Sequence, residues 1–206
     1  MIGAEFRGEL RGPGDRIIPA YDRMPWPDIM ATAFEISDST GPGKTNSAHV
    51  RSGVDYAVEH LAGAGQLTMI DSKYHDIPPT VEDSVKEAAA TGAALITVHA
   101  SGGPKMLAAA ARGAEQGRRE IGQVFRDRFG DKLGLVLGIT VLTSLDAEDC
   151  ESIFGIPQSD PEGIQKKAIQ FTRMAVDAGL DGVVCSPLEV QALREISAFD
   201  NMLIVA

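Results

Sequence analysis

QLTMIDSKYHDIPPT, residues 66–80, is the stretch that decides the predicted fold. Its apolar start, 66–70, is typical of a buried strand, and charged residues follow where that strand ends. In an extended strand Asp71 and Lys73 point to the same side, so their carboxylate and ammonium can be neighbours, whereas Asp76 comes after the chain has turned. The alternative is a salt-bridged loop on a solvated rim. The stretch therefore predicts a buried strand with charges at its carboxyl end.

Further apolar runs alternate with segments of helical spacing. The runs are IIPAY (17–21), ALITVHA (94–100), GLVLGITV (134–141), GVVCS (182–186) and MLIVA (202–206), with a weaker candidate strand at 43–46. The expected helices include one with Val50, Val54, Ala57, Val58 and Leu61 on a single face, one from Thr80 to Gly92, and two longer ones at 104–128 and 161–178. This alternation predicts a parallel α/β fold.

The number of predicted strands selects the architecture. A (β/α)₈ barrel needs eight strands and usually about 250 residues, whereas this sequence has 206 residues and seven candidate strands. We therefore expect an α/β fold of the TIM (β/α)₈ barrel type, truncated before the eighth strand. The length suits one domain, expected at 17–206, and the polar, glycine-rich residues 1–16 are predicted to form an N-terminal tail.

Composition narrows the class of protein. The formal net charge of −10 repels a nucleic-acid backbone, while local lysines can still attract a small anion. No run approaches about 20 apolar residues, and charged residues interrupt 1–16 where a signal peptide would be apolar. Two cysteines are too few for a disulfide framework, and none has zinc-ligand spacing. These features predict a cytoplasmic protein without a nucleic-acid or membrane partner.

Polar side chains follow several predicted strands at comparable positions, where barrel enzymes build their sites. The candidates are Asp22, Lys44, His99, Ser101, Thr143 and Ser144. For each residue taken alone, a structural role is the competing interpretation. Thr143 or Ser144 can cap the helix that Asp146 begins, and His99 can be a hydrogen-bonded core histidine.

Four motifs together resemble the orotidine 5′-phosphate decarboxylases. They are MIDSKYHDIPPTV (69–81), TVHASGG (97–103), TVLTSLD (140–146) and AGLDGVVCS (178–186), and the resemblance spans 17–206. The most specific part is the aspartate-lysine-aspartate segment followed by Ile-Pro-x-Thr. The resemblance implies a homodimeric barrel enzyme, a carboxy-lyase that converts orotidine 5′-monophosphate to uridine 5′-monophosphate in the last step of de novo UMP synthesis. It implies no cofactor and no metal.

The resemblance also implies roles for individual residues. The catalytic set is Lys44, Asp71, Lys73 and Asp76, with Lys73 as the proton donor to C6. Asp22 and Lys44 match residues that bind the ribose hydroxyls, and Thr143, or Ser144 if the alignment shifts by one, matches the residue at the pyrimidine. Asp71 and Asp76 also belong to the substrate-binding set. Asp76, Ile77 and Thr80 are expected to serve the site of the neighbouring subunit.

The sequence departs from the family pattern at two places. Gly41, Pro42 and Gly43 precede Lys44 where the family has an apolar strand, and the family's Pro-Gly-Ile-Arg motif and eighth strand, which hold the phosphate, have no counterpart. We therefore expect a weak or inactive enzyme for these 206 residues alone. One alternative is a remnant that acts as a dimerising module. Another is a magnesium-dependent sugar-phosphate lyase of the same superfamily, which would need a glutamate ligand where Asp22 and Lys44 stand.

Overall fold

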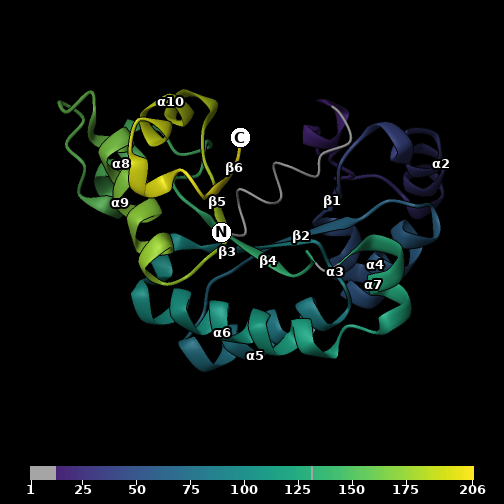
Figure 1. The fold of residues 1–206 in the computed structure, drawn as a ribbon. Coiled ribbons are helices and arrows are strands. Elements are labelled where there is room, and N and C mark those ends of the chain that lie inside the picture. The colour runs from purple at the N-terminus through teal and green to yellow at the C-terminus, as the bar shows by residue number, and fades with distance from the viewer. Residues whose placement is uncertain (1–12, 131) are drawn as a thin grey trace.

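A computed structural model describes residues 13–130 and 132–206 and contains one six-stranded parallel sheet. Its strands follow chain order: β1 (Gly43–Thr45), β2 (Thr68–Tyr74), β3 (Leu95–His99), β4 (Leu135–Ile139), β5 (Gly182–Val184) and β6 (Leu203–Val205). Because each crossover adds the next strand on the same side, the sheet winds in one direction and curls (Figure 1). Within the described residues β1 and β6 are the sheet edges. The weaker candidate strand at 43–46 is confirmed as β1.

The expected strand at 17–21 is wrong, because only Ala20 forms a β-bridge, with Lys44. The segment nevertheless runs beside β1: Tyr21 N–H donates to the Lys44 carbonyl, and Lys44 N–H donates to the Pro19 carbonyl. Pro19 has no N–H of its own, so a regular ladder cannot form. Of the predicted tail, residues 1–12 lie outside the described residues, and Pro13–Arg16 form a 3₁₀ turn.

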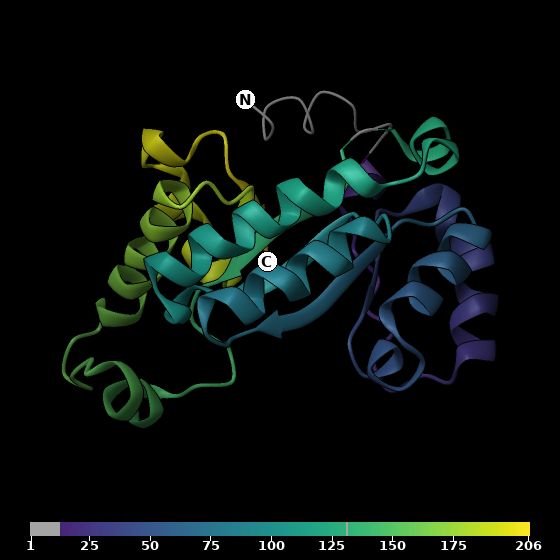
Figure 2. The same ribbon diagram turned by 90° about the horizontal axis from the view of Figure 1, so that it is seen from below.

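Helices lie outside the curled sheet, and those at 54–63, 78–90, 104–120 and 163–177 pack against its strands (Figure 1). The described helices are α2 (Trp26–Ile36), α3 (Ser47–Ser52), α4 (Val54–Gly63), α5 (Pro78–Ala90), α6 (Pro104–Glu120), α7 (Gln123–Phe129), α8 (Ala147–Phe154), α9 (Gly163–Asp177) and α10 (Val190–Arg194). Figure 2 shows α5 and α6 side by side across the sheet. A Cβ added at Gly113 or Gly117 of α6 would lie 2.2 Å from a backbone oxygen of α5, so glycine permits this close approach. No described helix is long and apolar enough to cross a membrane.

Two predicted helices are interrupted. Gly53, at a φ of 94°, separates α3 from α4, and Val50 is 78% exposed instead of lying on the buried face. The expected helix at 104–128 breaks between α6 and α7, where Ile121 turns into the core and Gly122 adopts an extended conformation. Helical spacing correctly predicted which residues of α4 are buried. It did not predict where the two helices break.

The strands alternate between two apolar environments. Ile70, Ile96, Val136 and Val183 pack outward against the helices, whereas the inward set is Met69, Leu95, Leu135 and Leu137. Since successive side chains of a strand point to opposite faces, Asp71 follows Met69 onto the concave face. The strand pattern therefore directs this carboxylate into the interior of the curled sheet.

The amino end of the sheet is held by a partly buried ion pair. Arg118 of α6 places Nη2 2.6 Å from Asp181 Oδ2, just before β5, and also donates to the Gly134 carbonyl at 2.9 Å. The same Asp181 oxygen accepts the Val136 N–H at 2.8 Å. This pair joins α6 to the starts of β4 and β5, far along the strands from Asp71.

Candidate active site

A cavity of about 650 Å³ occupies the concave face of the sheet. Its apolar wall includes Met69 and Leu95 of the inward set, with Ile139, Val184, Leu203 and Val205. The charged residues that line it are Asp15, Arg16, Lys44, Asp71, Lys73 and Arg194. Cations outnumber carboxylates on this wall, so the cavity suits an anionic small molecule in a protein whose net charge is negative.

Four predicted residues form one connected charged cluster: Asp22, Lys44, Asp71 and Lys73. Lys44 Nζ lies 2.6 Å from Asp22 Oδ2 and 3.5 Å from Asp71 Oδ2, and Lys73 Nζ lies 2.6 Å from that same Asp71 oxygen. Carboxylate and ammonium therefore alternate from Asp22 to Lys73. The prediction that Asp71 and Lys73 are neighbours is confirmed.

The backbone of β2 brings Asp71 and Lys73 together through a bulge. Ile70 pairs with Ile96 and Tyr74 with Val98, so β2 uses more residues than β3 over the same span. Within this bulge Lys73 has a φ of 51°, an uncommon value for a residue with a side chain. The alternation of side chains in a regular strand correctly predicted that Asp71 and Lys73 are neighbours, but it did not predict the positive φ of Lys73.

The Asp71 carboxylate is kept ionised by its partners. Burial by itself would raise its pKa, but the hydrogen bond and charge of Lys73, the hydroxyl of Thr97 and the charge of Lys44 outweigh burial and hold the pKa below its ordinary value. Asp71 therefore remains a carboxylate, and its negative charge lies beside the amino groups of Lys44 and Lys73. The cluster can present an ammonium group to a developing negative charge in the cavity.

Sequence analysis missed several residues that support the cluster. Thr97 Oγ1 donates to Asp71 Oδ1 at 2.9 Å, Asn46 donates to the Asp71 carbonyl at 2.7 Å, and His49 Nε2 lies 3.0 Å from Ser72 Oγ. Thr97 could have been found as the polar residue inside the apolar run LITV. Asn46 and His49 carry no comparable pattern, because only the tertiary structure places α3 behind β2.

Asp76, Ile77 and Thr80 lie together at the start of α5, and all three are exposed. The Asp76 carboxylate accepts the Ile77 N–H at 2.6 Å, and Ile77 is 64% exposed. The expected helix start at Thr80 moves to Pro78. Within one chain, the cluster thus ends at Lys73, and these three residues remain accessible to another molecule.

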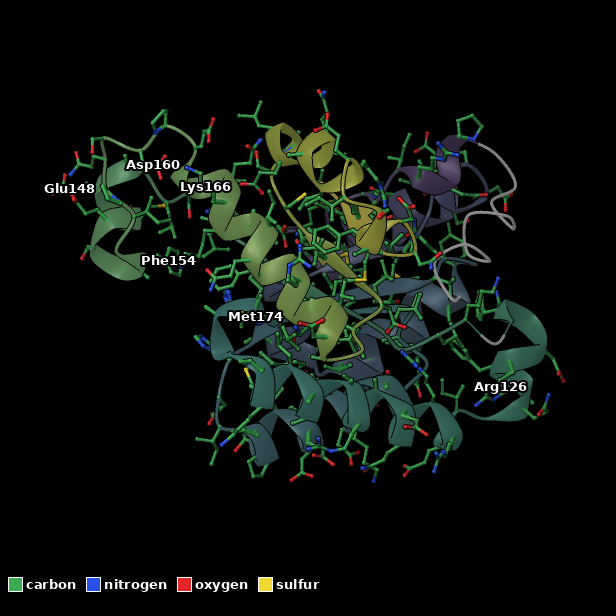
Figure 3. All side chains as sticks on the ribbon, turned by 60° about the vertical axis from the view of Figure 1, so that its left-hand side comes forward. Arg126, Glu148, Phe154, Asp160, Lys166 and Met174 are labelled. Carbon is green, nitrogen blue, oxygen red and sulfur yellow. The ribbon has the colours of Figure 1, made fainter. Side chains whose placement is uncertain are left out.

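Thr143 and Ser144 lie apart from the charged cluster. Both are exposed, and Thr143 lines a second cavity of about 540 Å³ beside the start of α9. The expected capping role is wrong, because Asp146 caps α8 in a reciprocal capping box with Asp149. Figure 3 shows this region, with Phe154 on α8 and with Asp160 and Lys166 flanking the turn into α9.

The remaining rim candidates make no ion pair with another described residue. Ser101 is exposed, and half-buried His99 packs its ring 5.3 Å from that of His75. Burial, followed by the charges of His75 and Lys73, lowers the pKa of His99. Across residues 13–130 and 132–206, no three histidine, cysteine, aspartate or glutamate side chains gather in a way that could hold a metal ion.

Comparisons with known proteins extend over most of this sequence. An orotidine 5′-phosphate decarboxylase of Anaeromyxobacter sp. (strain K) is 36% identical over 195 residues, covering 94% of this chain and 76% of the relative. The enzyme of that name from Heliobacterium modesticaldum is 31% identical over 190 residues, covering 92% and 73%. These names confirm the expected enzyme class, a carboxy-lyase.

Solved structures agree with the expected barrel type. Orotidine 5′-phosphate decarboxylase from Lactobacillus acidophilus matches with a TM-score of 0.72 and 27% identity, covering 91% of this chain and 78% of that one. The fold is also shared with the orotidine 5′-monophosphate decarboxylase of Methanocaldococcus jannaschii, solved with the inhibitor BMP, at a TM-score of 0.61 and 18% identity, covering 91% and 75%. Residues 15–206 match the family model described as Orotidine 5′-phosphate decarboxylase / HUMPS family. The chain therefore belongs to the orotidine 5′-phosphate decarboxylase / HUMPS family.

Proposed function

We propose that this protein decarboxylates orotidine 5′-monophosphate to uridine 5′-monophosphate without a cofactor. The observation that carries the proposal is the charged cluster, in which Lys73 and Asp71 meet at 2.6 Å on the wall of a cavity in a member of this family. The substrate is a small anion, in keeping with the cationic side chains around that cavity. Both cysteines are free and buried, which suits a reducing cytoplasm.

The chemistry needs a cation beside C6 of the orotate ring. When the bond from C6 to the carboxylate breaks, CO₂ leaves and the electron pair stays on C6 in the plane of the ring, where the π-system cannot delocalise it. The Lys73 ammonium stabilises this charge and then transfers a proton from Nζ to C6. Solvent returns a proton to the lysine, so one residue serves both steps and no redox change occurs.

Asp71 has two roles in this proposal. It orients the Lys73 ammonium, and it faces the substrate carboxylate, so that like-charge repulsion is relieved as CO₂ departs. Lys44 lines the same cavity on β1, and Asp22 lies 2.6 Å from its Nζ, so the two suit the ribose hydroxyls as donor and acceptor. The cluster thus pairs a reacting end at Lys73 with a binding end at Asp22.

We assign pyrimidine contact to Thr143, with Ser144 as the alternative. Support comes from its position after β4, at the same edge of the sheet as the charged cluster, and from the adjoining cavity of about 540 Å³. For both to contact one substrate molecule, ligand binding would have to move the loop that carries Thr143 toward the charged cluster.

The test of the reaction is the loss of orotidine 5′-monophosphate absorbance with purified protein, with and without EDTA. We expect slow turnover, because the family's phosphate-holding motif has no counterpart in these 206 residues, and we expect it to resist EDTA and to fall by about 10³-fold or more in Lys73→Ala. Lys105→Ala is the matched control, since Lys105 is an exposed lysine at the start of α6. Turnover that requires magnesium would favour the sugar-phosphate lyase, and a folded dimer without turnover would favour the dimerising remnant.

We further propose a homodimer in which Asp76, Ile77 and Thr80 complete the partner's site. Their exposure at the start of α5, three to seven residues beyond Lys73, supports this assignment. Lys73→Ala and Asp76→Ala should each be inactive alone. Mixing them after reversible dissociation should restore about a quarter of wild-type turnover, because half of the dimers are mixed and each mixed dimer has one intact site. Failure of the mixture to recover any turnover would contradict a shared site.

A further inference from the structure

The bulge in β2 places a reacting lysine in a backbone conformation that needs support. Lys73 has a φ of 51°, and positive φ values in residues with a side chain persist only where their surroundings hold them. Its N–H donates to a side chain, Thr97 Oγ1, at 2.9 Å, and makes this bond in place of a ladder bond to a carbonyl of β3. The support for Lys73 therefore comes from a side chain on the adjacent strand.

Thr97 makes two hydrogen bonds with one hydroxyl. Oγ1 accepts the Lys73 N–H and donates to Asp71 Oδ1, each at 2.9 Å, while Thr97 has no exposed surface. The direction of both bonds is fixed, because an amide N–H can only donate and an ionised carboxylate can only accept. The hydroxyl thus joins the backbone of the lysine to the carboxylate that its own ammonium contacts.

We propose that Thr97 is a positioning residue for the decarboxylation, which sets where the Lys73 ammonium lies relative to the Asp71 carboxylate. This inference rests on the proposed function. Two links close a ring: Lys73 Nζ contacts Asp71 Oδ2 at 2.6 Å, and Thr97 joins Lys73 N–H to Asp71 Oδ1. β3 pairs with both β2 and β4, so the hydroxyl is anchored in the centre of the sheet.

The opposite side of the bulge has its own support. Asn46 donates to the Asp71 carbonyl at 2.7 Å, and Ser72 contacts His49, which in turn contacts Thr45 Oγ1 at 3.0 Å. These bonds do not involve Thr97. Loss of the Thr97 hydroxyl should therefore loosen the geometry of Lys73 and Asp71 while the bulge and the fold persist.

The first experiment follows the geometry by NMR in Thr97→Val, Thr97→Ser and wild type. Valine keeps the shape and removes the hydroxyl, whereas serine keeps the hydroxyl. In Thr97→Val we expect the Lys73 amide to lose protection from hydrogen exchange by about 10-fold or more and the pKa of the Asp71 carboxyl to rise, because a bond to its ionised form is gone. Thr97→Ser should match wild type in both. Unchanged exchange and an unchanged Asp71 pKa in Thr97→Val would overturn the inference, whatever the protein's activity.

The titratable groups around Asp71 are unchanged by these variants, so the shift can be assigned to Thr97. They are Asp22, Lys44, His49, Lys73 and His99. Thr68→Val is the matched control on β2, because its buried hydroxyl has no hydrogen-bond partner among the described residues. Thr68→Val should leave both NMR readouts unchanged.

The second experiment measures turnover. We expect Thr97→Val to lower kcat for orotidine 5′-monophosphate by about 10- to 100-fold with little change in KM, and Thr97→Ser to retain most of kcat. An inactive wild type would refute the proposed function and leave the NMR result to decide the position of Lys73. An active wild type with equal kcat in Thr97→Val and Thr97→Ser would refute the positioning role alone.

Discussion

Asp71 and Asp181 are two similarly buried aspartates at opposite ends of the same sheet. Each side chain is 7% exposed, and each has a cationic nitrogen 2.6 Å from Oδ2, Lys73 in one case and Arg118 in the other. Their pKa values nevertheless move in opposite directions. The pKa of Asp71 lies below its ordinary value and that of Asp181 above it.

The difference lies in the number of cations that compensate for burial, two lysines at Asp71 and one arginine at Asp181. Around Asp71, two lysines and the Thr97 hydroxyl together outweigh burial. At Asp181, as at Asp71, burial is the largest single influence, but here the Arg118 charge and the N–H groups of Val136 and Asp181 do not overcome it. The carboxyl end of the sheet thus maintains a charge for chemistry, whereas the pair at the amino end joins helix to strand.

The largest expected effect is on turnover, which should fall when Asp71 is replaced and persist when Asp181 is replaced. Asp71→Asn should lower turnover of orotidine 5′-monophosphate by about 10²-fold or more, because Lys73 loses its charged partner. Asp181→Asn should retain turnover within about threefold, since an asparagine oxygen can still accept from Arg118 and Val136. Steady-state kinetics on folded protein measures both. Equal losses of turnover in the two variants would mean that both aspartates act through folding and that Asp71 has no special role in the reaction.

A smaller effect concerns stability in acid. Because the folded-state pKa of Asp71 is depressed, its contribution is present above the ordinary value of 3.8 and is lost as pH falls through the folded pKa. Urea unfolding should therefore show a free-energy deficit of Asp71→Asn at pH 6 that shrinks toward pH 3. A deficit that is independent of pH would contradict the depressed pKa.

The smallest effect is the opposite trend at Asp181. A raised folded-state pKa gives a contribution that is present below 3.8 and is lost as pH rises through the folded pKa. Asp181→Asn should accordingly gain stability relative to wild type between pH 3 and pH 6, by about 1 kcal/mol or less. The same urea series provides the measurement, with Asp71→Asn as its internal comparison. Parallel trends in the two variants would show that the two carboxylates have the same environment.

Much of the charged cluster was predictable from sequence. Asp71 and Lys73 follow an apolar run, so period-two alternation places them on one face at a strand end. Asp22 follows the apolar run 17–21, Lys44 lies in the candidate strand 43–46, and the carboxyl ends of parallel strands meet at one edge. The strand predicted at 17–21 was wrong because Pro19 prevents a regular ladder, and the apolar pattern of that run outweighed this local signal in the prediction.

The sequence by itself determined the class of fold, the strand order and the side chains available at the carboxyl edge, because these depend on periodicity and on short motifs. Only the tertiary structure decided the bulge at Lys73 and the hydrogen bonds that Thr97 makes across it. It also decided the opposite pKa shifts of Asp71 and Asp181. These properties depend on which groups from distant segments surround each atom, and burial and Coulomb interactions act through space without regard to sequence separation.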